Sequence, residues 1–336
     1  MDSVRVAYPA ARDAAILDAL EALLAPGLLL DRDAEAPRRC AILIDGRPEQ
    51  ADLDANDVLK SVVIPFAGVP RVTAEMVAAK PGVTLHNLHH NAPETAETAL
   101  ALLLAAARDT IRMDRALRNH DWRPRYEPSR TVRLEGKVAL VLGFGAIGRR
   151  IAASCAALGM EVHAVRRRSG ESEPDGAVSV HPATDLDELL PRTDALLIAL
   201  PHTNETDGLI GKERLARLRP GAILVNVARA QIVDEEALWE ALSGGHLHSA
   251  GLDVWYRYPH ADAAAVPGYF HAPAAAASTP PANYPFETLD NVVMSPHRGG
   301  TSAETETYRI RALAELLVPA AEGKPMANRI DLALGY

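Results

Sequence analysis

The sequence predicts an α/β fold built from two doubly wound parallel-sheet domains. Short apolar runs alternate with stretches of helical periodicity along most of the chain, and one run leads directly into a glycine-rich turn. Strands that alternate with helices form parallel sheets covered by helices on both faces. The length of 336 residues is sufficient for about two domains. The hydrophobic share of 48% is enough to give each domain a core.

Residues 1–90 begin this alternation. We expect strands at residues 4–8, 41–44, 61–66 and 83–88. Apolar residues at helical spacing predict helices over residues 10–24 and 73–80. A longer helix is expected from Glu94, directly after Pro93. Its apolar residues recur at the spacing of one helix face: Leu100, Leu103, Leu104 and Ala107.

From Lys137 onward the apolar runs are richer in Val, Ile and Leu, as is typical of parallel strands buried on both faces. We expect strands at residues 138–142, 161–165, 195–200, 222–227, 249–254 and 292–295. Helices are expected over residues 146–158 and 304–322. Residues 260–282 are rich in Ala and Pro and have no sustained periodicity, so we expect a surface loop or, alternatively, a lid over an active site.

The composition argues against several classes of protein. The formal net charge of −9 is opposite to the basic surface of a nucleic-acid binder. The longest apolar run, residues 99–107, is far shorter than the roughly 18–20 residues that span a bilayer. The opening MDSVRVAYPA lacks the basic and apolar regions of a secretory signal, and Cys40 and Cys155 are too few for a disulfide framework. We therefore expect a soluble, cytoplasmic protein without nucleic-acid or membrane partners.

A glycine-rich motif follows the strand expected at residues 138–142. Gly143, Gly145 and Gly148 are spaced as G-x-G-x-x-G, with Ala146 and Ile147 between the last two, and the motif opens a helix. In a dinucleotide site the first glycine allows a tight turn, the second lets the backbone approach a pyrophosphate, and the third permits close helix–strand packing. The amino end of the helix then faces the anion. The alternative is an ordinary glycine turn.

The residues after the next strand indicate which dinucleotide binds. In NAD-binding folds an acid at this place accepts hydrogen bonds from the ribose hydroxyls. Here Arg166, Arg167, Arg168 and Ser169 follow the strand instead. Guanidinium groups and a hydroxyl suit a dianionic 2′-phosphate, so we expect NADP to be preferred over NAD. The alternative is a solvated basic turn on an acidic protein.

Six segments stand in the order ETAETALALLLAAAR, LGFGAIGRRIA, ALPHTNETDGLIG, NVARAQIVDEEALWEAL, AGLDVWYRYP and SPHRGGTS. Together they resemble the D-isomer-specific 2-hydroxyacid dehydrogenase family, over most of the chain and most closely from Glu94 to Ser302. The resemblance implies an oxidoreductase that transfers a hydride between NADP(H) or NAD(H) and C2 of a 2-oxo or 2-hydroxy carboxylic acid.

The resemblance also implies how the domains are arranged. A Rossmann nucleotide domain, residues 94–297, is expected to be inserted into a flavodoxin-like substrate domain formed by residues 1–93 and 298–336. The carboxylate substrate would bind in the cleft between them. A homodimer is implied, with the long helix from Glu94 in its interface.

Two residues are expected to act on the substrate. Arg229 follows a strand, where a guanidinium can bind a carboxylate through two hydrogen bonds and polarise the adjacent carbonyl. His297 also follows a strand, and imidazole titrates near neutral pH, as a general acid/base requires. By themselves they would more often be a solvated arginine and a structural histidine. Their flanking segments resemble the family's catalytic segments and favour the catalytic roles.

The family's third catalytic residue is a glutamate that orients the histidine and raises its pKa. Its position, five residues after Asp253 and before Pro259, is occupied by Tyr258. A phenol accepts a hydrogen bond from imidazole but, being neutral, does not stabilise imidazolium by charge. We therefore expect a lower pKa for His297 and a lower pH optimum for carbonyl reduction. Alternatively, Asp262 or another acid of the following loop substitutes, or the reaction dispenses with the pair.

The resemblance assigns further residues to the cofactor and the substrate. Cofactor contacts are expected from Pro201, Thr206, Val227, Ala228 and Asp253, with Asp253 at the nicotinamide carboxamide. Substrate contacts are expected from Phe66, Ala67, Gly68, Asn91 and Arg298, although a surface role for Arg298 is equally open. No metal is expected, because nothing completes a ligand set around the adjacent His89 and His90.

Two other functions remain open. Because the glutamate is missing, the chain is alternatively a nucleotide-sensing protein without turnover. In the second alternative, the chain acts on a different substrate, a formate- or phosphonate-type acid, without the histidine–glutamate pair. The presence of Arg229 and His297 favours the dehydrogenase.

Overall fold

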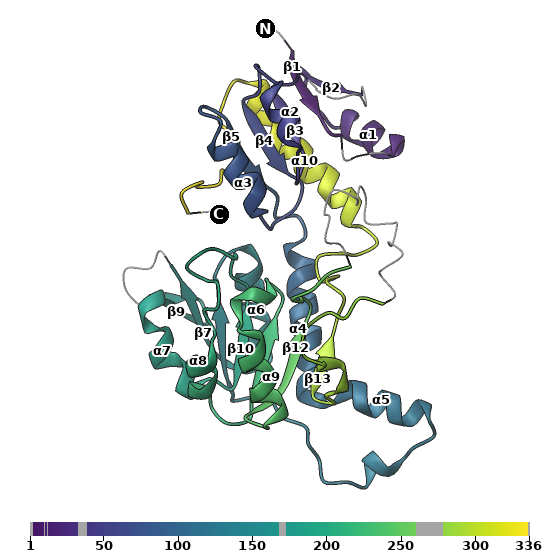
Figure 1. Ribbon diagram of the computed structural model, residues 1–336, viewed down its shortest axis with the longest axis vertical. Coiled ribbons are helices and arrows are strands. Elements are labelled where there is room, and N and C mark those ends of the chain that lie inside the picture. Colours follow the sequence, from purple (N-terminus) through teal and green to yellow (C-terminus); the bar gives the residue numbers. More distant parts are fainter. Residues whose placement is uncertain are drawn as a thin grey trace. The chain divides into compact units, whose positions relative to one another are not determined.

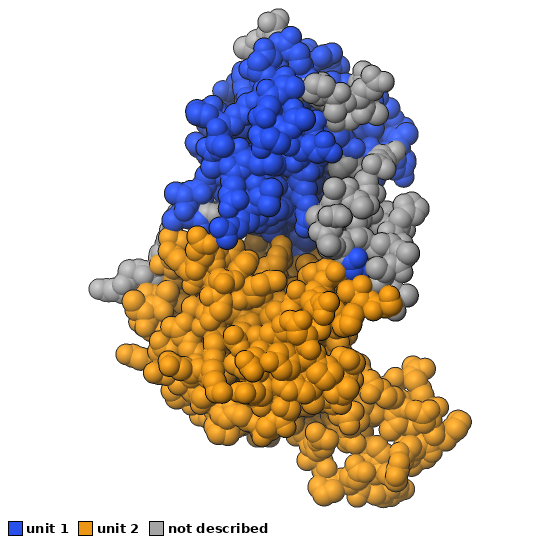
Figure 2. Space-filling model, in the orientation of Figure 1, with its two compact units in different colours: residues 1–91, 259–277, 301–336 blue, residues 92–258, 278–300 orange. Residues whose placement is uncertain are grey.

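The computed structural model describes residues 3–9, 11, 13–32, 39–167, 173–259 and 278–334. They form two compact units (Figure 2). Unit 1 takes its residues from Met1–Asn91, Pro259–Ala277 and Thr301–Tyr336, and unit 2 from Ala92–Tyr258 and Ser278–Gly300. Unit 1 thus contains residues from both ends of the chain, whereas unit 2 is formed by the chain between them. Most of the loop or lid expected at residues 260–282 lies outside the described residues.

Unit 1 contains a parallel sheet of five strands in the order β2-β1-β3-β4-β5 (Figure 1). The strands are β1 (Val4–Ala7), β2 (Leu28–Asp31), β3 (Ile42–Ile44), β4 (Ser61–Ile64) and β5 (Thr84–Asn87). The helices are α1 (Ala14–Glu21), α2 (Gln50–Asp54), α3 (Arg71–Ala78) and α10 (Thr305–Ala321). This strand order is the flavodoxin-like one of doubly wound folds.

Alternating side chains of these strands fill two cores, one on each face of the sheet. Ile42 and Ile44 of β3 join a cluster with α1 and α10, whereas Leu43 between them joins a cluster with α2 and α3. Successive side chains of a strand point to opposite faces, so both faces are covered. The C-terminal helix α10 therefore completes a core whose strands lie in the first ninety residues.

Unit 2 contains a sheet of eight strands in the order β13-β12-β11-β10-β6-β7-β9-β8 (Figure 1). The strands are β6 (Val138–Leu142), β7 (Glu161–Arg166), β8 (Glu173–Asp175), β9 (Val178–Pro182), β10 (Ala195–Ile198), β11 (Ala222–Asn226), β12 (Leu247–Leu252) and β13 (Val292–Met294). Only the edge strand β8 pairs antiparallel; the other described pairs are parallel. The order reverses between β6 and β10, which is the Rossmann topology.

Helices cover both faces of this sheet too. One core contains α4 (Ala92–Arg108) and α6 (Ala146–Ala157), and the other contains α7 (Leu186–Leu189), α8 (Lys212–Arg217) and α9 (Glu235–Ser243). Helix α5 (Thr110–Arg118) has no buried residue. Short 3-10 turns are η1 (Arg123–Arg125), η2 (Ala183–Asp185), η3 (Leu190–Arg192), η4 (Ala230–Ile232) and η7 (Phe286–Thr288). Among the described residues, no helix combines the length and the apolar character needed to cross a membrane.

The α/β fold expected from the sequence is confirmed. Each expected strand is present, and its ends lie within two residues of the predicted ones. The long helix begins at Ala92 rather than Glu94, because Pro93 is compatible with the first turn of a helix. Strands β2, β8 and β9 and helices α2 and α5 were not expected. They are short or little buried, so their apolar patterns are weak.

Candidate active site

The glycine turn lies where β6 passes into α6. Gly143 has φ +95°, and a Cβ there would lie 2.6 Å from the carbonyl oxygen of Ala199. A Cβ at Gly148 would lie 1.7 Å from the carbonyl oxygen of Gly143, whereas one at Gly145 would meet no atom within 4 Å. Gly143 and Gly148 are thus required by close packing, and Gly145 leaves open space beside the amino end of α6. This is the cradle that a dinucleotide pyrophosphate requires.

Two arginines lie at the carboxyl end of the neighbouring strand. Arg166 is the last residue of β7, and Arg167 follows it. A guanidinium nitrogen of Arg167 lies 3.2 Å from a carboxylate oxygen of Glu205. Arg168 and Ser169, the other members of the predicted 2′-phosphate cluster, lie outside the described residues.

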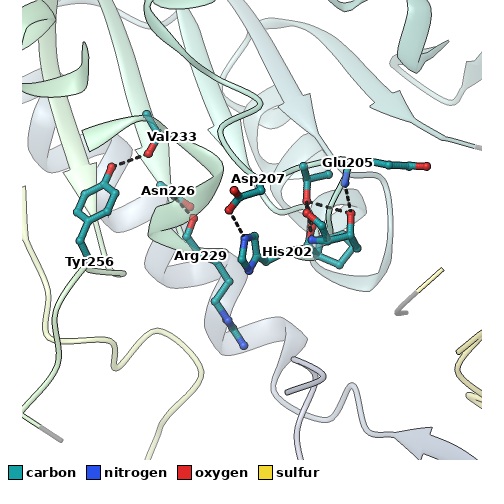
Figure 3. Close-up of polar contacts among 10 residues, drawn as sticks. His202, Glu205, Asp207, Asn226, Arg229, Val233 and Tyr256 are labelled. Atoms are coloured by element: carbon teal, nitrogen blue, oxygen red, sulfur yellow. Dashed lines mark hydrogen bonds and ion pairs between the residues drawn. The ribbon is translucent and has the colours of Figure 1, made fainter. Parts of the chain in front are cut away.

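The loop after β10 carries Glu205 and is closed by its own side chains (Figure 3). The hydroxyl of Thr206 donates to the carbonyl of Pro201 at 2.7 Å and accepts from the N–H of Thr203 at 2.8 Å. His202 Nε2 lies 2.7 Å from a carboxylate oxygen of Asp207. These bonds fix the shape of the loop in which the sequence places cofactor contacts.

Arg229 is held by the end of β11. The side-chain amide of Asn226 donates to the carbonyl of Arg229 at 3.0 Å (Figure 3) and accepts from the N–H of Ala228 at 3.0 Å. Asn226 is buried, and its own carbonyl accepts from the N–H of Asp253. The guanidinium of Arg229 donates to the carbonyl of Ala228 at 2.6 Å. Asn226 therefore fixes the turn that carries Arg229, a role that the sequence analysis missed.

Asp253, directly after β12, binds the segment that carries His297. Its carboxylate accepts hydrogen bonds from the hydroxyl of Ser295 at 2.5 Å and the N–H groups of Arg298 at 2.9 Å and Gly299 at 2.8 Å. Asp253 is only 1% exposed. A Cβ at Gly299 would lie 2.4 Å from the same carboxylate, so the contact requires glycine. The sequence predicted a nicotinamide contact for Asp253; these bonds show a second task for its carboxylate.

His297 follows β13 and has φ +56°, a left-handed conformation that is uncommon for a residue other than glycine. The bonds from Asp253 to Ser295, Arg298 and Gly299 hold this turn on both sides. Left-handed residues that the surrounding structure holds in this way occur often at functional sites.

Tyr258 lies beside His297. Its hydroxyl oxygen is 2.8 Å from Nδ1 of His297 and accepts the N–H of Trp255 at 3.2 Å. The indole N–H of Trp255 donates in turn to the carbonyl of Ser295 at 2.8 Å. Trp255 thereby links the tyrosine to the histidine segment, and it too was missed from the sequence.

Burial is the largest influence on the pKa of both side chains. Burial lowers the pKa of His297, the positive charge of Arg229 lowers it further, and Asp253 opposes this. Burial raises the pKa of Tyr258, although the Trp255 N–H and the charge of Arg229 oppose the rise. The direction for His297 agrees with the sequence prediction. Arg229 is close enough for its charge to act on both partners.

The substrate-binding residues predicted from Phe66 to Asn91 belong to unit 1. Phe66, Ala67 and Gly68 follow β4, and the side chain of Asn87 donates to the carbonyl of Ala67 at 2.7 Å. This bond fixes the backbone whose N–H groups are expected to meet the substrate. Arg298 belongs to unit 2, beside His297. Within the described part of the chain, no group of three or more His, Cys, Asp or Glu side chains is placed to hold a metal ion.

The strand order and the glycine turn define unit 2 as a dinucleotide-binding fold of the Rossmann type. The chain belongs to the D-isomer-specific 2-hydroxyacid dehydrogenase family. Residues 100–299 match the family model described as D-isomer specific 2-hydroxyacid dehydrogenase, NAD binding domain.

Several proteins of known name are similar. D-3-phosphoglycerate dehydrogenase of Archaeoglobus fulgidus is 32% identical over 305 residues, covering 89% of this chain and 52% of the relative. Glyoxylate reductase of Korarchaeum cryptofilum is 32% identical over 260 residues, covering 76% and 71%. A solved D-isomer specific 2-hydroxyacid dehydrogenase of Xanthobacter autotrophicus Py2, in complex with NADPH and MES, has a TM-score of 0.78 at 27% identity, covering 99% and 100%. The chain spans about half the length of the phosphoglycerate dehydrogenases that it matches.

Proposed function

We propose that the chain is an NADP(H)-dependent 2-oxoacid reductase, or 2-hydroxyacid dehydrogenase in the reverse direction. The observation that carries the proposal is the cluster of Arg229, Tyr258 and His297, which follow β11, β12 and β13. In open α/β sheets, ligands bind outside the carboxyl ends of the strands, where these residues lie. Membership of the family and the names of the relatives support the same reaction.

The glycine cradle fits a dinucleotide, which would supply or accept the hydride when bound. Its pyrophosphate would be held by Gly143, Gly145, Ala146, Ile147 and Gly148. Its nicotinamide side would lie near Pro201, Thr206, Val227, Ala228 and Asp253. Arg166, Arg167 and Ser169 would bind the 2′-phosphate, so NADP is preferred and NAD is the weaker cofactor. The solved relative that contains NADPH supports this preference.

Each catalytic residue then has one task. Arg229 binds the substrate carboxylate through two hydrogen bonds and draws electron density from the adjacent carbonyl. His297 gives a proton to the oxygen that becomes the hydroxyl, and takes it back in the reverse direction. By their likeness to the family, Phe66, Ala67, Gly68 and Asn91 are proposed as further substrate contacts, and Arg298 as a cation for a second anionic group.

The test is NADPH oxidation with glyoxylate, hydroxypyruvate and longer 2-oxo acids. Turnover is expected, together with a rate that falls at least about 100-fold in Arg229→Gln, because a bidentate charged contact is lost. Arg217→Gln on α8 removes an exposed guanidinium away from the cluster and serves as the matched control. NADPH binding without turnover of any 2-oxo acid would support a sensor. Turnover of only formate or a phosphonate-type acid would support the other alternative.

The cofactor preference has its own test. Arg167→Gln should raise the KM for NADPH and leave that for NADH unchanged. Glu205→Gln should lower the KM for NADPH and leave that for NADH unchanged. It removes the carboxylate that pairs with Arg167 at 3.2 Å and that would repel a 2′-phosphate. Equal effects on both cofactors would contradict the 2′-phosphate role.

We also propose a homodimer formed through unit 2. Leu104 of α4, Ile111 and Leu117 of α5, and the following Trp122 and Tyr126 are exposed large apolar side chains. Solvent-exposed apolar residues that gather on neighbouring elements mark interaction surfaces. Light scattering on the purified protein should give twice the chain mass, and Trp122→Glu should lower it; a monomeric wild type would contradict the proposal.

A further inference from the structure

The hydrogen bonds around Tyr258 limit which groups can receive its proton. The hydroxyl oxygen already accepts the N–H of Trp255 at 3.2 Å, and Nδ1 of His297 lies 2.8 Å away. A phenol has a single proton to donate, and the partner at Trp255 is itself a donor. The Trp255 contact leaves the phenol proton available to donate to Nδ1. A neutral imidazole that accepts at Nδ1 carries its own proton on Nε2.

We propose that Tyr258 supplies a proton to Nδ1 of His297 during the reduction. The neutral imidazole, with its own proton on Nε2, is then the acid that protonates the substrate oxygen. The inference deepens the proposed function and rests on it. It assigns Tyr258 more than the orientation of the ring, because a side chain that only accepts a hydrogen bond cannot refill Nδ1. Tyr258 acts through His297 and is in this sense a positioning and proton-supplying residue.

Two protons move during the reduction. When the hydride adds to C2 of the oxo acid, the electron pair of the carbonyl moves to oxygen. That oxygen forms a bond to the proton of Nε2, and the Nε2–H bond breaks. Nδ1 takes the phenol proton, which leaves a phenolate at Tyr258. After the hydroxy acid leaves, a solvent proton reaches Nε2 and the Nδ1 proton returns to the phenolate, so one hydride and one solvent proton are consumed.

Two groups would stabilise a transient phenolate against the burial that raises the pKa of Tyr258. The Trp255 N–H donates to the oxygen that becomes negative, and the guanidinium of Arg229 contributes an opposite charge nearby. The carboxylate of Asp253 opposes them, but it already accepts three hydrogen bonds from the His297 segment. Solvent can complete the cycle, because both side chains keep a solvent-exposed edge although the surrounding protein partly desolvates them.

This arrangement changes the expected pH dependence. If imidazolium were the acid, reduction would slow as the pH rises through the lowered pKa of His297, as the sequence analysis supposed. When Tyr258 can supply a proton to Nδ1, the neutral imidazole remains an acid. The rate of reduction then stays level as the pH rises through the pKa of His297. Burial, Arg229 after β11 and Asp253 after β12 set the pKa of His297, and Tyr258 after β12 is hydrogen-bonded to it.

The first experiment is nitrogen-15 NMR of histidine-labelled protein without cofactor or substrate, with His297 assigned by the loss of its signals in His297→Asn. We expect neutral His297 to carry its proton on Nε2, with Nδ1 as an acceptor. In Tyr258→Phe this preference should be lost. A wild-type His297 protonated on Nδ1 would overturn the proposal, and this readout does not depend on turnover.

The second experiment is the pH profile of kcat for oxo-acid reduction. We expect a level profile in the wild type, and in Tyr258→Phe and Tyr258→Glu a rate that falls about tenfold per pH unit above the His297 pKa, because only imidazolium then donates. A Tyr258→Phe rate reduced equally at all pH values would overturn the proposal and indicate a structural role. If the wild type reduces no 2-oxo acid, the proposed function fails, while the NMR result still tests the pair.

Discussion

Replacing Asp253 with Asn tests whether this carboxylate holds the His297 segment in place. The substitution changes neither shape nor volume, but it removes the charge and turns one oxygen into a donor. In either orientation of the amide, an NH2 group faces a backbone N–H, of Gly299 or of Arg298. A buried donor is then left unsatisfied, at a cost of about 1–3 kcal/mol.

The total follows from the three bonds to Asp253. Hydrogen bonds to a charged acceptor contribute about 1.5–3 kcal/mol and neutral ones about 0.5–1.5, so each remaining bond weakens by about 1 kcal/mol. With the unsatisfied N–H, we expect the free energy of unfolding of unit 2 to fall by roughly 3–5 kcal/mol. The negative charge of Asp253 also raises the pKa of His297, so the variant should titrate His297 at a lower pH.

Tryptophan fluorescence in urea measures the first effect, because all three tryptophans, Trp122, Trp239 and Trp255, lie in unit 2. NMR titration of His297 measures the second. Asp194→Asn is the control, since that carboxylate accepts the Val138 N–H and should affect stability without moving the His297 titration. A free energy within about 0.5 kcal/mol of the wild type, or an unchanged titration in Asp253→Asn, would refute the reasoning.

Three further predictions concern the turn that carries Arg229, the glycine cradle and a histidine of unit 1. Asn226→Asp replaces the donor to the Arg229 carbonyl with an acceptor; one lost hydrogen bond predicts an oxo-acid KM raised about tenfold, and unchanged kinetics would contradict it. Gly148→Ala should lower the urea midpoint of unit 2, whereas Gly145→Ala should fold normally and bind NADPH at least about tenfold more weakly; the reverse pattern would contradict the assignment. Burial and nearby positive charge lower the pKa of His90 to about 4, so it stabilises the fold fully above its ordinary value of 6.5 and progressively less as the pH falls toward 4. His90→Gln should flatten the fall of Tm over that range by circular dichroism, and an unchanged slope would exclude His90 as its cause.

The sequence predicted the buried strands well because burial on both faces leaves nearly continuous Val, Ile and Leu. It missed β2, an edge strand of four residues, because so short an apolar run has no clear period. It also missed α5, whose residues are not buried and which carries a local ion pair between Arg118 and Asp114. Its large apolar residues, Ile111 and Leu117 among them, are exposed and separated by charged residues, so they form no sustained apolar run.

The candidate site shows the same division. His297 and Tyr258 were predicted from their flanking segments, and the structure brings their side chains within hydrogen-bonding distance. Asn226, Trp255 and Ser295 were missed because their roles arise from bonds across the ends of three neighbouring strands. Of these, Asn226 gave a signal, as a polar residue ending an otherwise apolar strand that proves to be buried.

The most direct test of the proposed function compares the wild type with His297→Asn in NADPH oxidation by 2-oxo acids. Asn tolerates the left-handed φ of +56° better than other residues except glycine, so the turn should be kept while the acid is lost. The proposal predicts turnover by the wild type, and in the variant unchanged NADPH affinity with a rate at least about 100-fold lower. A variant that keeps the wild-type rate, or a wild type that binds NADPH and reduces no 2-oxo acid, would contradict it.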